Sequence, residues 1–131
     1  MESTSTAVSL SRIGQIALNV KDLARATSFY RDTLGMKFLF EAPGLAFFDA
    51  GGVRLMMAVA EKPEFDHPAS ILYYRVEDIN GTHRALEARG VRVVEAPRLV
   101  APMPDYDLWI SAYRDSEDNH FALMSEVKRA A

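Results

Sequence analysis

The sequence predicts an α+β fold built from two copies of one unit, in which a strand and a helix are followed by three strands. The chain has 131 residues, which suits one domain or two small halves with one core. Val20-Lys21-Asp22 returns as Val76-Glu77-Asp78, and similar strand and helix signals surround both. Each half has too little apolar area for a stable core, so we expect the halves to join around a shared cleft.

The first half opens with a strand over residues 13–20, in which large apolar side chains alternate with polar or small ones. Asp22 is a candidate N-cap for a helix whose apolar residues recur at helical spacing as far as Leu34, and Gly35 is a C-cap signal. The remaining elements are a strand from Met36, a turn at Pro43-Gly44, and a hairpin of residues 45–49 and 53–59 around Gly51-Gly52.

The second half repeats this order after a charged linker over residues 61–69. A strand over 71–76 leads to Asp78 as an N-cap, and a helix then runs to Arg89. A strand over 91–94 precedes a loop from Ala96 to Asp107 that holds three prolines; such a loop is either a lid or a structural connection. The last predicted elements are a hairpin of residues 107–114 and 119–125, and flanking tails over 1–11 and 127–131.

Composition excludes several classes of function. An apolar content of 49% and a mean hydropathy of -0.07 are typical of a globular domain. We predict that this domain covers residues 12–126, with modules over 12–60 and 70–126. The net charge of -3 and the lack of a basic stripe argue against nucleic acid as a partner. No apolar run approaches the roughly 18 residues of a membrane span. The sequence has no cysteine, which removes disulfides and thiolate chemistry and fits a cytoplasmic location.

Two runs are the most distinctive, Phe29-Tyr30-Arg31-Asp32-Thr33-Leu34-Gly35-Met36 and Tyr113-Arg114-Asp115-Ser116-Glu117-Asp118-Asn119. With the strand and helix start over 13–22, they resemble the vicinal oxygen chelate superfamily. That superfamily includes glyoxalase I, extradiol dioxygenases, methylmalonyl-CoA epimerase, and bleomycin and fosfomycin resistance proteins. The resemblance covers residues 12–126 and implies two tandem βαβββ modules that form an eight-stranded open cleft. Ser116 and Asp118 depart from the family's common Asp-Pro-Asp-Gly-Asn turn.

Metal-using members of this superfamily hold a divalent ion with four side chains, usually His, Gln or Glu, from the first and last strands of each module. The resemblance places these positions on Gln15, Met56, Ile71 and Ala122. Only Gln15 is of a ligand type, because a thioether is a poor ligand for hard cations and the other two side chains have no donor atom. We therefore predict no metal cofactor, and a divalent metal follows only if a metal-dependent alternative holds.

Strand alternation extends the predicted cleft to residues two positions away on the same strands. The ligand-binding candidates are Gln15, Arg54, Met56, Ile71, Tyr73, Arg75, Ile110, His120 and Ala122. Each polar member also has a purely structural alternative. Gln15 could hydrogen-bond to backbone, and His120 could stabilise the turn. Arg54 and Arg75 could pair with carboxylates at the rim. The opposite faces, which include Leu18, Leu55 and Phe121, should pack under the helices, and Trp109 should pack there or at a subunit contact.

Three functions fit this pattern. The first is a metal-free protein of the bleomycin-resistance type that binds an apolar or aromatic small molecule. The second is a divalent-metal-dependent lyase, epimerase or dioxygenase, similar to lactoylglutathione lyase. The third is a metal-free acid-base enzyme that uses His120 and Tyr73, since the ordinary pKa of His lies near neutrality. The resemblance also implies a homodimer.

Overall fold

The computed structural model describes residues 11–60 and 70–129, and it confirms the α+β fold of two βαβββ modules. The predicted linker 61–69, residues 1–10 of the N-terminal tail and residues 130–131 of the C-terminal tail lie outside the described residues. Module one consists of β1 (Gln15–Asn19), α1 (Leu23–Ser28), the π-helical turn η1 (Phe29–Thr33), β2 (Lys37–Ala42), β3 (Leu45–Ala50) and β4 (Val53–Ala58). Module two consists of β5 (Leu72–Arg75), α2 (Ile79–Ala88), β6 (Arg92–Pro102), β7 (Tyr106–Arg114) and β8 (His120–Lys128).

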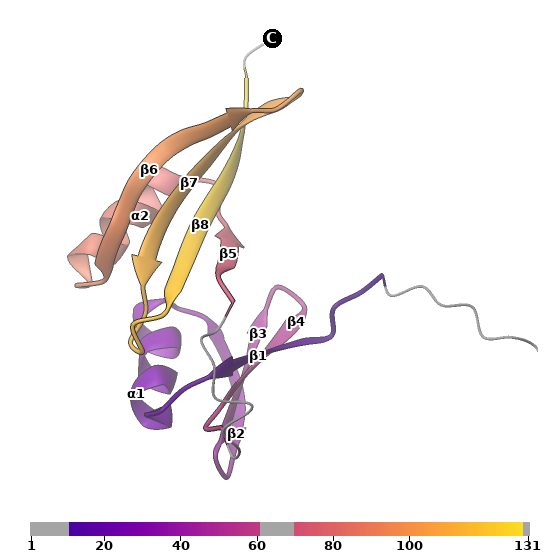
Figure 1. Cartoon of the computed structure of the whole chain (residues 1–131), viewed down its shortest axis with the longest axis vertical. Helices are drawn as coiled ribbons and strands as arrows, with labels where there is room; N and C mark the ends of the chain where they lie inside the picture. Colours follow the sequence, from indigo (N-terminus) through magenta and orange to yellow (C-terminus); the bar gives the residue numbers. More distant parts are fainter. Residues whose placement is uncertain (1–10, 61–69, 130–131) are drawn as a thin grey trace, which may run out of the picture.

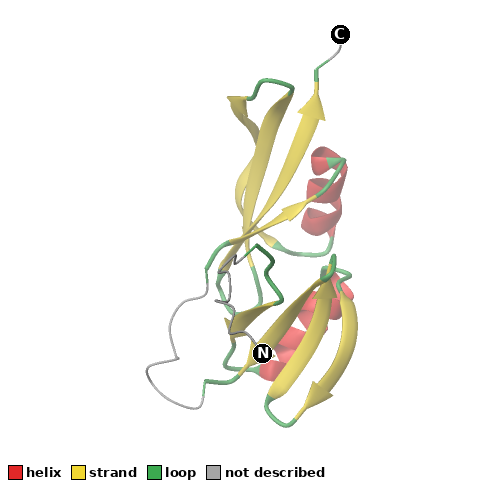
Figure 2. Ribbon diagram, turned by 90° about the vertical axis from the view of Figure 1, so that its right-hand side faces the viewer, coloured by secondary structure: helices red, strands yellow, loops and turns green. Residues whose placement is uncertain are grey.

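Both modules have the same sheet topology. The strand orders are β1-β4-β3-β2 and β5-β8-β7-β6, in which the first strand of each module runs parallel to the last and the other pairs are antiparallel. The two sheets follow one another along the long axis of the molecule, and each carries its helix on one face (Figures 1 and 2). None of the helices formed by the described residues is long and apolar enough to cross a membrane.

The predicted caps start and stop the helices. The Asp22 side chain accepts a hydrogen bond from Arg25 N, and the Asp78 side chain accepts one from Gly81 N, so each satisfies a free N–H of a first turn. Gly35 and Gly90 have φ angles of 72° and 81°, which side chains with a Cβ rarely adopt. The sequence alone did not reveal that the first helix widens into a π-helical turn before Gly35.

Each module has its own apolar core between helix and sheet. The core of module one buries Leu18, Val20, Leu55 and Met57 with Tyr30. The core of module two buries Phe121 and Leu123 with Leu86. Trp109 packs against the second core. The helix-facing side of both sheets is therefore the one that strand alternation predicts, which leaves the opposite faces open.

The predicted long loop over Ala96–Asp107 is wrong. β6 continues to Pro102 and pairs with β7, which begins at Tyr106, so the connection is only residues 103–105. Pro97 lies where the register shifts between Glu95 and Arg98, and β6 is the edge strand of its sheet. Proline is tolerated at bulges and on edge strands because no ladder hydrogen bond needs its missing N–H. This segment is therefore an edge strand paired with β7. β8 likewise runs to Lys128, beyond the predicted strand end at 125.

A buried hydrogen bond joins the two modules. The hydroxyl of Tyr30 in η1 donates to Asp115 Oδ2 at 2.8 Å, and Asp115 follows β7 in module two. Burial and then the nearby charge of Asp115 raise the pKa of Tyr30, so its hydroxyl keeps its proton at neutral pH. The other carboxylate oxygen, Asp115 Oδ1, accepts from Glu117 N at 2.8 Å and Asn119 N at 2.9 Å. The contact thereby fixes both the turn and the seam between the modules.

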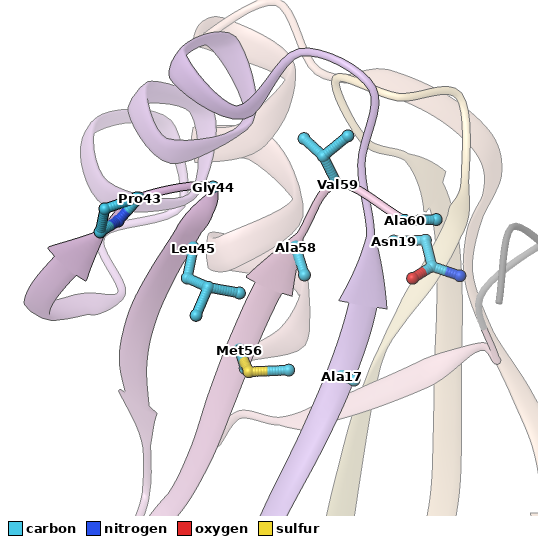
Figure 3. A pocket seen from close by; sticks show the side chains of 9 residues that line it. All are labelled: Ala17, Asn19, Pro43, Gly44, Leu45, Met56, Ala58, Val59 and Ala60. Carbon is cyan, nitrogen blue, oxygen red and sulfur yellow. The ribbon is translucent and has the colours of Figure 1, made fainter. Parts of the chain in front are cut away.

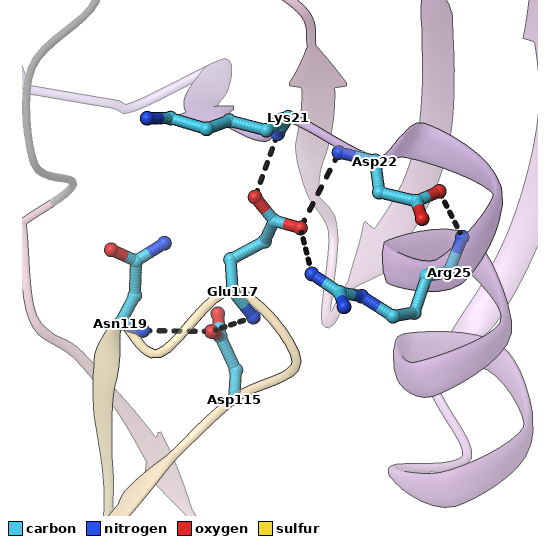
Figure 4. Close-up of polar contacts among 6 residues, drawn as sticks. All are labelled: Lys21, Asp22, Arg25, Asp115, Glu117 and Asn119. Atoms are coloured by element: carbon cyan, nitrogen blue, oxygen red, sulfur yellow. Dashed lines mark hydrogen bonds and ion pairs between the residues drawn. The ribbon is translucent and has the colours of Figure 1, made fainter.

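Glu117 makes a second bridge across the same seam. Its carboxylate accepts from Lys21 N at 2.6 Å and from Asp22 N at 3.4 Å, and it forms an ion pair of 3.1 Å with Arg25 (Figure 4). A carboxylate at this place stabilises the start of α1, because the first N–H groups of a helix have no partner within it. The turn of module two therefore caps the helix of module one.

We expect Tyr30→Phe to lower the free energy of unfolding by about 1.5–3 kcal/mol, because it leaves one oxygen of a buried carboxylate without its donor. Tyr74→Phe is the matched control. Tyr74 is also largely buried, and burial raises its pKa to about 12; its hydroxyl lies near that of Tyr30 but makes no hydrogen bond of good geometry among the described residues. Its removal should change the free energy of unfolding by less than about 0.5 kcal/mol. Urea unfolding followed by circular dichroism would measure both, and equal losses in the two variants would contradict the assignment.

Candidate functional site

The candidate binding site lies on the open face of the first sheet. Strand pairing lines up residues from four strands on it. The row at its centre runs Ala17, Met56, Phe47 and Phe40, and a second row holds Asn19, Ala58, Leu45 and Ala42. Small side chains at Ala17 and Ala58 keep the face hollow between the larger ones. The sequence thus builds a concave apolar floor directly from the alternation of its strands.

A pocket of about 570 Å³ lies on this floor (Figure 3). Such a volume is in the range of small-molecule sites. The connection after β2 and the end of β4 close it on two sides. Its lining residues are Ala17, Asn19, Pro43, Gly44, Leu45, Met56, Ala58, Val59 and Ala60.

A polar pair borders the pocket at its Met56 side. Arg54 Nε donates to Gln15 Oε1 at 2.8 Å, and Gln15 Nε2 lies 3.6 Å from the Met56 sulfur. The Arg54 guanidinium carbon also lies 5.3 Å from the centre of the Phe47 ring, within the range of a cation–π contact. Three sequence-predicted residues, Gln15, Arg54 and Met56, therefore meet here.

The donor set at the family's four metal positions does not fit a divalent ion. Gln15 has the one ligand-type oxygen, and that oxygen already accepts from a guanidinium, whose positive charge disfavours a cation beside it. Met56 offers only a thioether, and Ile71 and Ala122 offer no donor. Among the described residues, no three His, Asp or Glu side chains gather into a possible metal site.

The predicted residues of module two do not line this pocket. Ala122 is buried in register between Tyr73 and Ala112, and Tyr73 and Ile71 are exposed. Arg75 forms an ion pair of 2.6 Å with Glu126, so it pairs with a carboxylate as one of its two predicted roles requires. His120 is exposed at the start of β8 and lies opposite Arg114. Ile110 is half-buried on β7 and lies opposite Met124. The pocket on module one is lined by none of the candidates from module two.

Strand alternation from Gln15 and Met56 alone missed the β2–β3 part of the site. Leu45 and Phe47 face the pocket side because the Gly51-Gly52 turn pairs them with Ala58 and Met56. The hairpin was predicted, so its register was an available signal. Phe40 was harder to place, because an irregularity between Phe38 and Phe40 reverses the side to which the strand presents its residues.

The comparisons with known proteins agree with this architecture. The model of the glyoxalase/bleomycin resistance protein/dioxygenase superfamily matches residues 12–102. The chain belongs to this superfamily. No curated protein sequence gives a significant match.

Several solved structures share the fold of this superfamily member. A glyoxalase/bleomycin resistance protein/dioxygenase from Nocardioides is 22% identical, with 95% of this chain and 91% of that chain covered and a TM-score of 0.70. TnmS3, an antibiotic binding protein from Streptomyces sp. CB03234, is 20% identical, with 92% and 99% covered and a TM-score of 0.73. Lactoylglutathione lyase from Agrobacterium tumefaciens is 24% identical, with 88% and 93% covered and a TM-score of 0.68. At these identities the likeness concerns the fold.

We expect untagged protein to carry far less than one transition-metal ion per chain after dialysis against Zn²⁺, Ni²⁺, Co²⁺ or Mn²⁺. Elemental analysis by plasma mass spectrometry would measure this content. Met56→His, which places a family-type donor beside Gln15 on the same module, is the comparison variant. One tightly held ion per chain in the unchanged protein would contradict the donor argument.

Proposed function

We propose that the protein binds an apolar or aromatic small molecule on the open face of module one, without a resident metal. The observation that carries this proposal is the pocket of about 570 Å³ with an apolar floor and one polar pair at its border. Ligand sites commonly combine apolar walls with a few placed polar groups. TnmS3, a relative in fold, is an antibiotic binding protein, which supports binding as a use of this architecture.

The two enzymatic alternatives have less support. A lactoylglutathione lyase shares the fold, but the lyase-like alternative needs a metal that the donor set here does not fit. Acid-base catalysis by His120 and Tyr73 would have to occur on module two, outside the pocket. Binding therefore remains our proposal, in the cytoplasm as the sequence predicts.

We further propose that the protein is a homodimer in which a second copy covers part of the open faces. On module two, Ile71 and Tyr73 are 47% and 52% exposed. Apolar side chains grouped on open sheet faces favour association. Light scattering coupled to gel filtration should give twice the chain mass, and a monomer at high protein concentration would contradict the dimer.

Ala17→Leu tests the pocket itself. Ala17 lies in the central row of the floor, so the larger side chain should fill the pocket and weaken ligand binding at least about tenfold. Suitable neutral probes are benzamide, 2-naphthamide and anthracene-2-carboxamide, with binding measured by calorimetry and by thermal shift.

Ala24→Leu is the matched control, because Ala24 is exposed on α1 and lies away from the pocket. It should leave probe affinity unchanged. The proposal fails if neither these amides nor the corresponding carboxylates bind the unchanged protein, or if the two leucine variants bind equally well.

A further inference from the structure

Arg54 stands apart from most arginines of the described chain. Seven others form ion pairs with carboxylates: Arg25, Arg31, Arg75, Arg92, Arg98, Arg114 and Arg129. Arg54 has Asp49 as its register partner on β3, yet no ion pair joins the two within the described residues. Instead Asp49 Oδ1 accepts from Gly52 N at 3.1 Å in the hairpin turn. A cation therefore lies beside an apolar pocket with its charge uncompensated by a described carboxylate.

The Arg54 side chain is also held in place. Its Nε is engaged by Gln15 Oε1 at 2.8 Å, and its guanidinium carbon lies 5.3 Å from the Phe47 ring centre. These contacts use Nε and a face of the group, and they leave the two terminal nitrogens as a parallel pair of donors. Such a fork matches the two oxygens of a carboxylate, and fixing it beforehand reduces the entropy lost on binding.

Flat aromatic surface lies next to this fork. The rings of Phe40 and Phe47 stack with centroids 4.5 Å apart and an interplanar angle of 27°. Phe47 is the register neighbour of Met56, which lines the pocket, and Phe40 remains 49% exposed. A planar ring system laid on the floor would contact Met56 and the exposed Phe40 side chain, as aromatic and thioether groups favour.

We propose that the ligand is a planar aromatic molecule with one carboxylate, and that Arg54 is the specificity-determining residue that binds this carboxylate. This inference rests on the proposed function and names the class of ligand. The rings lie on the apolar floor, and the carboxylate accepts hydrogen bonds from the terminal nitrogens of Arg54. Gln15 is a positioning residue, because it orients the guanidinium and does not itself meet the ligand.

Matched acid and amide pairs separate this inference from the proposed function. The probes are benzoate, 2-naphthoate and anthracene-2-carboxylate, each against its carboxamide of nearly the same shape. Because charge-assisted hydrogen bonds are about twice as strong as neutral ones, we expect the best acid to bind about tenfold or more tightly than its amide. Calorimetry at low and at 0.5 M salt would measure the difference, which should shrink as salt screens the charge.

Arg54→Met should abolish the preference for the acid while the amide still binds, and Arg54→Lys should keep only part of it. Arg98→Met is the control, because Arg98 is an exposed arginine on β6 of the other sheet whose partner is Glu95. It should leave both affinities unchanged. Circular dichroism would verify that the variants fold.

The inference is overturned if acid and amide bind the unchanged protein equally, or if the preference survives in Arg54→Met; in both cases the proposed function stands. If no acid and no amide binds, the proposed function itself fails and takes the inference with it.

Discussion

The carboxylate of Asp115 is the contact on which the arrangement of the two modules depends. It is buried, and its oxygens accept from two backbone N–H groups of its own turn and from the hydroxyl of Tyr30 in the other module. A buried charge is tolerated when hydrogen bonds replace its water. The turn itself supplies two donors, and the third is present only when the turn packs against module one. In this way a short polar segment links the two modules.

The internal repeat made most of the fold predictable from the sequence. Asp22, Gly35, Asp78 and Gly90 mark helix ends by local chemistry, which acts the same way wherever the helix packs. The proline-rich segment after residue 95 was misread because proline usually signals a loop. It is a strand because β7 lies beside it and because a bulge at an edge accommodates Pro97. The cap that Glu117 provides for α1 also lay beyond prediction, since a residue 96 positions away from Lys21 supplies it.

The site was predictable in part for a similar reason. Strand alternation put Gln15, Arg54 and Met56 on one face, because the period of a strand does not depend on its neighbours. Which residues complete the pocket depends on strand pairing instead. Phe47 comes to the site through its register with Met56, and Phe40 comes through an irregularity in β2 that propensities do not reveal. Strand alternation also does not show that the candidates of module two lie outside the pocket, because their place depends on how the two sheets are arranged along the molecule.

The two modules keep one backbone plan but present different chemistry at equivalent positions. On module one, the row that starts the open face runs from Gln15 through Arg54 to Asp49, and Arg54 is free of Asp49 because the hairpin turn binds that carboxylate. On module two, the corresponding strands bring His120 beside Arg114, and Asp118 of the turn pairs with both Arg92 and Arg114. The charges of Arg92 and Arg114 are thus compensated within the module, and Ala122 stands where module one has Met56. Among the described residues, only module one combines an arginine without a carboxylate partner with a hollow apolar floor, and module two contributes the turn that bonds to it.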